Sequence, residues 1–440
     1  MKKSGIIIAS LFLFIAFVGC NEKSKSKDDI IIVANVTLST GSGFEKYGEQ
    51  VWNGLALLRD TLASHHVQLK HQNNQGSEAT TIQNFSRWIG REDVPIVITN
   101  NSPLSKNART IAEENKINQI ALVAGDIDFC DGYQWALRDA IMQNQEGEVL
   151  APVVLRQSGL KTIVMLGVND DYGTDGMKYL EQELLKANND INIIKSTFDK
   201  STIDFSSIID SQLASKPDAI YFAGRDKAIV RYVNTLKDKL RRKRTDSTIR
   251  ISLVKSALDQ LTTDCSNNID RWLAGKPEII NLTGLDKAIV RYVNTLKDEP
   301  ELKQTDIPIY ICDAFDDKDV WDQLGSNAKG IVFASYYNNF DNPEGQAFLK
   351  QYREAYGKDP GIYAVDAYVC GQYILKLVSE GNRTAESFNK AFETMTFDSP
   401  IKGYLYVNNH SVVSSVATYV INEQGEKELI YKPDVNIETE

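Results

Sequence analysis

The sequence has little of the chemistry that enzymes and metal proteins need. It contains four histidines, none of them in a metal-binding spacing: His65, His66, His71 and His410. It has no G-x-S-x-G nucleophile motif and no Walker phosphate loop. A dinucleotide fingerprint that included Gly41 and Gly43 would need glycine at position 46, where the chain has Lys46. We therefore expect no enzymatic activity, no metal and no cofactor.

Positive charge and cysteine are scarce as well. The formal net charge of −10 argues against a nucleic acid partner, because it leaves no broad basic surface to meet phosphates. The basic cluster Lys239–Arg244 is predicted to be a solvated loop. Four cysteines beyond Cys20 are far apart and form no C-x-x-C motif, so two disulfides and buried free thiols both stay open. These four are Cys130, Cys265, Cys312 and Cys370.

The apolar run near the N-terminus, Ile6–Val18, is shorter than the roughly 20 residues that a membrane-spanning helix needs. Lys2 and Lys3 precede it, as in a cleaved secretory signal. The segment Phe17–Cys20 resembles a bacterial lipoprotein box, which predicts a signal peptide over 1–20 and a lipidated Cys20. The alternative is a plain signal peptide with an incidental cysteine. Residues 21–29 are polar or charged and are predicted to be a flexible tether.

A strand, a glycine loop and a helix follow the tether. Ile30–Val33 is an apolar run typical of a buried parallel strand. The loop contains Gly41, Ser42 and Gly43, and apolar residues then recur three and four apart, as on one face of a helix. Ligands bind outside the carboxyl ends of parallel strands, so the loop Ser39–Tyr47, with Ser42 and Tyr47, is predicted to contact ligand.

The same alternation continues along the chain. Strands are predicted over 67–70, 95–99, 119–124 and 162–167. Helices are predicted over 79–89, 108–115, 149–158 and 177–186. This order predicts an α/β fold of parallel sheets with helices on both faces. A chain of 440 residues is too long for one core, so two domains or more are expected.

Several short motifs together resemble one known family. Thr40-Gly41, Tyr47-Gly48 and Asn53-Gly54 open the chain, and Asp170–Gly173 (DDYG) follows a later strand. In this order they resemble type I periplasmic binding proteins, the branch of the leucine/isoleucine/valine-binding proteins of ABC transporters. The resemblance implies two doubly wound parallel-sheet lobes joined by three hinge crossings, near 138–142, 335–340 and 400–405. The expected N-terminal lobe is 30–140 plus 337–402, and the expected C-terminal lobe is 141–336 plus 403–440.

The C-terminal lobe contains an internal duplication. Asp226–Asp238 and Asp286–Asp298 are both DKAIVRYVNTLKD, 60 positions apart, within two units at 191–250 and 251–310. The family has one such unit, so the extra one is predicted to pack onto the second lobe. Two interpretations remain, a modified partner surface and a tolerated duplication without a role.

The resemblance also implies a ligand site. Ser102 falls on a family serine, Ala124 on the next contact, and Gly125 replaces a family threonine. In the second lobe Tyr172 and Asp313 fall on family contacts, and Asp313 takes the acidic position that holds a ligand ammonium. Asp226 or Asp286 follows the duplicated strand, and which copy faces the cleft stays open. Turn formation and helix capping are the structural alternatives for Ser102 and Asp313, and a core position is the alternative for Tyr172.

The implied function is an extracytoplasmic, lipid-anchored solute-binding protein, located in the periplasm or at the cell surface. It would bind an amino acid or a related small polar ligand between its lobes and deliver it to an ABC permease. The alternative keeps the fold without a transporter, as a ligand-sensing lipoprotein or a regulator of cell-wall synthases, because fold alone does not choose between these functions.

Overall fold

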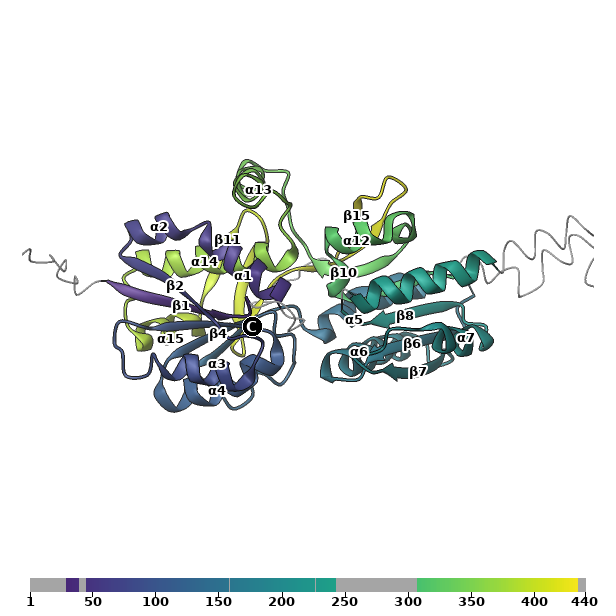
Figure 1. Cartoon of the computed structure of the whole chain (residues 1–440), viewed down its shortest axis with the longest axis horizontal. Helices are drawn as coiled ribbons and strands as arrows, with labels where there is room; N and C mark the ends of the chain where they lie inside the picture. The colour runs from purple at the N-terminus through teal and green to yellow at the C-terminus, as the bar shows by residue number, and fades with distance from the viewer. Residues whose placement is uncertain (1–28, 39–44, 158, 226, 243–306, 434–440) are drawn as a thin grey trace, which may run out of the picture.

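The chain forms two α/β lobes that lie side by side (Figure 1). The structure is a computed structural model, and it describes residues 29–38, 45–157, 159–225, 227–242 and 307–433. Each lobe is built on one mixed sheet of mostly parallel strands. The first sheet has the strand order β11-β12-β13-β5-β4-β3-β1-β2, and the second has the order β15-β14-β10-β9-β8-β6-β7. The predicted fold class of two lobes is confirmed.

The first lobe combines the start of the chain with a later segment. Its strands are β1 (Ile30–Val36), β2 (Val67–Asn73), β3 (Ile96–Asn100), β4 (Asn118–Leu122), β5 (Ala136–Asp139), β11 (Thr396–Ser399), β12 (Gly403–Asn408) and β13 (Ser411–Val413). Its helices are α1 (Glu45–Ala56), α2 (Arg59–Ser64), α3 (Glu78–Ser86), α4 (Ser102–Asn115), α13 (Pro343–Tyr356), α14 (Ile362–Ser379) and α15 (Ala385–Glu393).

The second lobe takes the middle of the chain and the last strands. Its strands are β6 (Thr162–Val168), β7 (Asn192–Phe198), β8 (Ala219–Ala223), β9 (Ile309–Ile311), β10 (Val332–Tyr336), β14 (Val416–Ile421) and β15 (Lys427–Tyr431). Its helices are α5 (Gln143–Leu155), α6 (Asp171–Ala187), α7 (Ser206–Ala214), a helix over 227–242 and α12 (Lys318–Leu324). Two short 3₁₀ turns flank α12, η2 (Asp313–Phe315) and η3 (Gly325–Ala328).

Strand β1 shows why helices cover both faces of the first sheet. Its alternate side chains point to opposite faces. Ile32 packs in one buried cluster with Leu55 of α1, and Val33 packs in another with Phe85 of α3 and Ala108 of α4. Both faces of the strand are therefore apolar, as the run of isoleucines and valine predicts.

Within the described ranges, the chain crosses between the sheets three times, from β5 to α5, from β10 to α13 and from β13 to β14. The prediction of the third crossing at 400–405, with all of 403–440 in the second lobe, is wrong for 403–413. Strand β12 pairs antiparallel with β11, and β13 pairs with β12 and with β5. Short turns keep consecutive strands adjacent, so β12 and β13 stay with the first sheet.

The extra copy of the duplicated unit leaves the second sheet continuous. Strand β8 belongs to the first copy and pairs directly in parallel with β9, with Ile220 opposite Ile309. The second copy, with Asp286, lies outside the described residues apart from its final part. Cys20, Ser42, Asp226 and Cys265 also lie outside the described residues.

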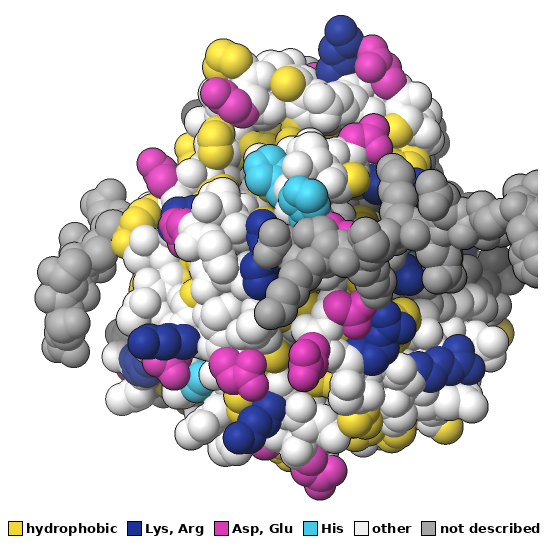
Figure 2. Space-filling view, turned by 90° about the vertical axis from the view of Figure 1, so that its left-hand side faces the viewer, with side chains coloured by type: hydrophobic (Ala, Val, Ile, Leu, Met, Phe, Trp, Pro, Cys, Tyr) yellow, Lys and Arg dark blue, Asp and Glu magenta, His cyan; other side chains and the backbone are white. Residues whose placement is uncertain are grey.

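Three further observations concern the residues that the structure describes. Cys130, Cys312 and Cys370 are free buried thiols, so no disulfide joins these three to one another. No helix in the described ranges is both long and apolar enough to span a membrane. Over the coloured part of the face in Figure 2, acidic and basic side chains are interspersed and form no broad basic surface.

Candidate functional site between the two lobes

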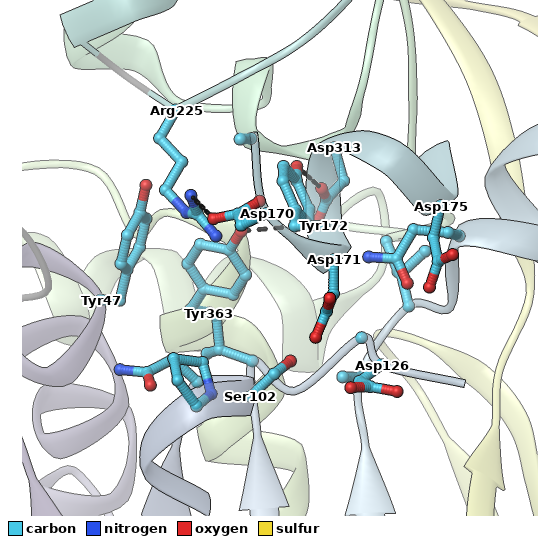
Figure 3. Close-up of a pocket in the computed structure, with 18 of the residues that line it drawn as sticks. Tyr47, Ser102, Asp126, Asp170, Asp171, Tyr172, Asp175, Arg225, Asp313 and Tyr363 are labelled. Atoms are coloured by element: carbon cyan, nitrogen blue, oxygen red, sulfur yellow. Dashed lines mark hydrogen bonds and ion pairs between the residues drawn. The ribbon is translucent and has the colours of Figure 1, made fainter. Parts of the chain in front are cut away.

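A cavity of about 290 Å³ lies between the lobes and is lined by both of them. Its walls are formed by the segments that follow the carboxyl ends of β3, β4 and β5 in the first lobe and of β6, β8 and β9 in the second. Parallel strands in one sheet end at the same edge, so residues far apart in sequence meet there. Figure 3 shows their side chains converging on this space.

The structure brings five of the predicted site residues to this cavity: Tyr47, Ser102, Gly125, Tyr172 and Asp313. The predicted ligand contact at Ala124 is wrong, because this residue is fully buried in a small apolar cluster with Phe129 and does not line the cavity. Its neighbour Val123 lines the cavity instead. The contact predicted at Ala124 is therefore shifted by one residue.

Helix α4 presents its N-terminus to the cavity. Asn101 caps the helix by accepting a hydrogen bond from the Leu104 amide at 3.3 Å, and Ser102 and Pro103 form the first turn. The side chain of Asn101 is buried, and its Nδ2 donor has no hydrogen-bond partner among the described residues. Pro103 has no amide N–H, and the Leu104 amide is bonded to the cap. This terminus therefore offers an anion the Ser102 amide, Nδ2 of Asn101 and the helix dipole. The capping role considered for Ser102 belongs to Asn101.

The loop after β4 explains why residue 125 is glycine. A Cβ at Gly125 would lie 2.6 Å from the Ile141 carbonyl oxygen and 2.9 Å from Nε2 of Gln143. A threonine therefore does not fit here, and the hydroxyl that the resemblance implies is absent. Val123 has a φ of 58°, which is strained for a β-branched residue. Such strain is typical of functional loops.

Asp313 joins the two lobes. It follows β9, and its carboxylate accepts hydrogen bonds from Tyr172 of the second lobe at 2.6 Å and from Tyr363 of the first lobe at 3.4 Å. Tyr363 lies in the first turn of α14 and packs edge-on against Tyr47, with ring centroids 5.3 Å apart. The acidic position thus lies where both lobes reach it, as Figure 3 shows.

A second carboxyl group lies directly behind Asp313. Glu146 of α5 is buried and accepts a hydrogen bond from the Asp313 amide at 3.1 Å. Burial and the nearby charge of Asp313 raise the pKa of Glu146 well above its usual range. Burial also raises the pKa of Asp313, although the two tyrosine hydroxyls oppose this. Two adjacent buried carboxylates do not both ionise readily, so the pair as a whole holds a proton more tightly than exposed carboxylates do.

An ionic cluster occupies the second-lobe wall next to Tyr172. Arg225, which follows β8, donates to Asp170 at 2.8 Å, and Lys200 lies 3.1 Å from the same carboxylate. The Arg225 guanidinium stands 4.9 Å from the centroid of the Tyr172 ring. Burial pushes the pKa of Asp170 upward, but the charge and hydrogen bond of Arg225 outweigh it and lower this pKa. The pair is therefore ionised at neutral pH.

A third cation, Lys106 of α4, stands on the first-lobe wall. It forms an ion pair with Asp126, which follows β4, and lies 3.6 Å from Asp171 of the second lobe. This contact crosses between the lobes. Like the contact of Tyr363 with Asp313, it belongs to a closed arrangement of the two lobes.

The floor of the cavity contains a buried charged network near the hinge. Lys402 forms an ion pair with Asp366 of α14, and Tyr336 at the end of β10 donates to Asp366 at 3.1 Å. Asp139, at the end of β5, accepts from Tyr373 at 3.1 Å. Burial and the charge of Asp366 raise the pKa of Asp139 to about 7, and Lys402 partly opposes this.

Sequence reasoning missed several lining residues that the structure shows, among them Arg225, Lys106, Tyr363 and Asp366. One signal was available for Arg225. The two copies of the repeat differ immediately before the identical segment, where the first has Gly224-Arg225 and the second has Gly284-Leu285. The structure places the first copy at the cavity through Arg225. Within the described part of the chain, no group of histidine, cysteine and acidic residues is arranged to hold a metal ion.

A sequence profile of the periplasmic binding protein family matches residues 33–240 and 247–426. The chain belongs to this family. No curated protein matches the chain. The two lobes, the three crossings and the inter-lobe cavity of this periplasmic binding protein agree with that membership.

Solved structures of similar fold come from several bacteria. A leucine-binding protein, LivK, from Thermotoga maritima aligns with a TM-score of 0.68 at 16% identity, over 92% of this chain and 99% of its own. The LivJ protein of Streptococcus pneumoniae in complex with isoleucine gives 0.67 at 16% identity, over 92% and 100%. A solute-binding protein of Rhodopseudomonas palustris with 3,4-dihydroxybenzoic acid gives 0.67 at 15%, over 93% and 98%. At these identities the likeness concerns the fold of the periplasmic binding protein alone.

Proposed function

We propose that this protein is the solute-binding component of an ABC transporter and that it binds an amino acid or a related small zwitterion between its lobes. The observation that carries this proposal is the pairing of two opposite electrostatic environments in one cavity. Donors at the start of α4, around Ser102, stand on the first-lobe wall, and the carboxylate of Asp313 stands on the second.

Each environment suits one end of a zwitterion. The helix start offers the Ser102 amide and hydroxyl and the unpartnered Nδ2 of Asn101 to a carboxylate. Asp313 offers its carboxylate to an ammonium, in a site where closure of the lobes excludes water and strengthens the attraction. Contact with both walls favours the closed form, because the ligand then binds that form more tightly than the open one.

The ligands of the similar structures agree with this size and polarity. Isoleucine is bound in the S. pneumoniae protein and 3,4-dihydroxybenzoic acid in the R. palustris protein, and both ligands carry a carboxylate. The helix start at Ser102 accounts for the feature that these ligands share. Asp313 favours the amino acid, because an aromatic acid has no ammonium to pair with it.

The alternative, a sensor or cell-wall-synthase regulator without a transporter, predicts a cleft that lacks paired polar groups. The paired environments of Ser102 and Asp313 favour the transport role. Permease and ATPase genes beside the gene for this chain would support transport, and their absence would support the alternative. Neither role involves a chemical step on the ligand.

We further propose that the protein is extracytoplasmic and lipid-anchored through Cys20, which becomes the N-terminus after removal of residues 1–19. Replacing Cys20 by Ser should release the protein from the membrane fraction into the soluble extracytoplasmic fraction. Fractionation followed by immunoblotting measures this, with Cys130→Ser as the matched cysteine control. An unchanged membrane fraction would show that Cys20 is not the anchor.

The ligand proposal is tested by isothermal titration calorimetry against amino acids, their amides and small carboxylic acids. We expect a zwitterionic amino acid to bind more tightly than its analogue without the amino group, because Asp313 has no partner in that complex. A thermal-shift screen should show the same order, since a ligand that binds only the folded state raises the melting temperature. Tighter binding of the analogues without an ammonium would refute the amino-acid proposal.

A further inference from the structure

Arg225 occupies a part of the cavity that the two ends of a zwitterion do not use. Figure 3 shows its guanidinium on the Tyr47 side of the cavity, with Asp170 between it and the Asp313–Tyr172 pair. Its side chain is 28% exposed, and the residue lines the cavity. A ligand held between Ser102 and Asp313 would therefore have Arg225 on one side of it and Asp126 on the other.

The orientation of Arg225 is held from two directions. Asp170 accepts from Nη1 at 2.8 Å and is itself fixed as the N-cap of α6, where it accepts from the Gly173 amide at 3.2 Å. The ring of Tyr172 supports the guanidinium plane at 4.9 Å. Such a guanidinium is pre-organised, so it loses little conformational freedom when it binds a ligand.

The guanidinium has donors left over. A guanidinium carries five N–H groups, and among the described residues only Asp170 accepts from it. Lys200 shares that carboxylate at 3.1 Å, so two cations face one anion at this point of the wall. An aliphatic ligand side chain pressed against Arg225 would remove water from these donors without replacing its hydrogen bonds, which is unfavourable.

We infer that the ligand side chain ends in a carbonyl oxygen, as a carboxamide or a carboxylate, and that Arg225 is the residue that selects it. This inference rests on the proposed function, because it presumes that Ser102 and Asp313 hold the main-chain groups of an amino acid. The guanidinium fork matches two acceptor oxygens or one carbonyl oxygen. Leucine, which is similar in size to asparagine but has no acceptor, is the ligand that this wall discriminates against.

The chain itself contains the apolar counterpart of this position. Arg225 precedes the identical segment in the first copy of the repeat, and Leu285 precedes it in the second. The substitution Arg225→Leu therefore places in the cavity the residue that the same local sequence carries elsewhere. It leaves Asp170 with Lys200 as a partner, so no carboxylate is abandoned. Arg231→Leu, on the exposed face of the following helix, is the matched control.

The test is calorimetric titration of the full mature protein with asparagine, glutamine, aspartate, glutamate and leucine. We expect the best of the four polar amino acids to bind at least about tenfold more tightly than leucine. In Arg225→Leu this preference should fall by about tenfold or more, with leucine bound no more weakly than before, whereas Arg231→Leu should keep the preference. Comparison of the amide pair with the acid pair identifies which carbonyl group is bound.

Two results would overturn the inference. One is that leucine binds the native protein as tightly as the best polar amino acid. The other is that Arg225→Leu leaves the ratio of affinities unchanged. If amino acids bind and the ratio does not move, this inference fails alone. If no amino acid binds, the proposed function fails and this inference with it.

Discussion

The two walls of the cavity provide polarity in different ways. The first-lobe wall offers mainly backbone and neutral groups, namely the start of α4 with Asn101 and Ser102 and the tight loop at Gly125, beside the ion pair of Lys106 with Asp126. The second-lobe wall offers ionisable side chains that follow three separate strands, with Asp170, Arg225 and Asp313 as its main groups.

This difference has an energetic consequence. A neutral hydrogen bond contributes about 1 kcal/mol, whereas truncation of one partner in a buried charged pair typically costs about 3–5 kcal/mol. The second wall should therefore dominate the affinity. The first wall should mainly orient the ligand, because its donors are fixed by the helix itself. Substitutions in the two walls should therefore differ in how much they weaken binding.

The largest effect is expected on the second wall. Asp313→Asn keeps the shape of the side chain and an acceptor for Tyr172 but removes the charge that pairs with a ligand ammonium. We predict that amino-acid binding weakens by at least about 100-fold, as calorimetry would measure. The melting temperature without ligand should fall little. Burial raises the pKa of Asp313, so its charge is unfavourable in the folded protein, and the substitution removes that charge from beside Glu146.

Asp175→Asn is the control for this prediction. Asp175 lines the same cavity from α6 and is not among the hydrogen-bond acceptors of Tyr172 and Tyr363 described above. Its substitution should change affinity far less than Asp313→Asn does. Equal losses in the two variants would mean that general negative charge, rather than a specific carboxylate, determines binding.

A substitution of Asp139, in the charged network at the floor of the cavity, tests whether buried charge affects stability as well as binding. The pKa of Asp139 is raised to about 7, above the roughly 3.9 of an unfolded chain, because of burial and the charge of Asp366. The folded state therefore binds more protons, and the free energy of unfolding falls as pH rises from about 4 to about 7. For one such group the slope reaches about 1.4 kcal/mol per pH unit.

Asp139→Asn should reduce this pH dependence, as urea unfolding at a series of pH values would show. The groups that face Asp139 are Asp366, Tyr373 and Cys370 of α14 together with Lys402. Lys402 keeps its ion pair with Asp366 in the variant. Parallel pH profiles for the native protein and the variant would assign the dependence to another group, such as Glu146.

A smaller effect is expected on the first wall. Ser102→Ala removes one hydroxyl and should weaken amino-acid binding by about fivefold, or about 1 kcal/mol. The helix start remains, because Asn101 provides the cap. Combined with Asp313→Asn, the two losses should add within about 0.5 kcal/mol, since they act on opposite ends of the ligand. A Ser102 loss as large as the Asp313 loss would remove the distinction between the walls.

The smallest effect is expected from the extra repeat. Deleting residues 243–298 keeps the helix over 227–242, whose Leu240 is buried, and leaves β8 free to pair with β9 as it does now. We predict a cooperatively unfolding protein with unchanged ligand affinity, measured by circular dichroism and calorimetry. A folded variant that no longer binds would mean that the duplicated unit contributes to the site.

Much of the fold could be predicted from the sequence because its signals are local. The apolar run of β1 and the three- and four-residue spacing in α1 predict a strand and a helix within one short segment. The pairing of β12 and β13 with the first sheet was missed. That choice depends on which edge of which sheet accepts a hairpin, and no local pattern around 403–413 encodes it.

The residues of the site also differ in whether a local sequence signal identifies them. Tyr47 was identified from its place in the loop after a predicted strand, whereas Ser102 and Gly125 were identified from the family resemblance, with the position at Ala124 shifted by one residue. Asp313 and Tyr172 came from resemblance. Arg225 and Tyr363 were missed, because their role depends on β8 and α14 meeting across the cavity from positions 138 residues apart in the chain, a relation that only the folded structure provides.

The bond between Tyr363 and Asp313 has a consequence for the protein when it is empty. This bond, with the contacts of Lys46 with Asp317 and of Lys106 with Asp171, joins the lobes through protein groups alone. These contacts stabilise the closed form, so they raise the fraction of the protein that is closed before a solute binds. The apparent affinity equals the intrinsic affinity of the closed form multiplied by the fraction of protein that is closed. Each of these contacts therefore increases the apparent affinity. Each also leaves a smaller fraction of the protein for the solute to convert from open to closed. Loss of the Lys46–Asp317 ion pair should therefore lower the apparent affinity and increase the change in shape that the solute causes.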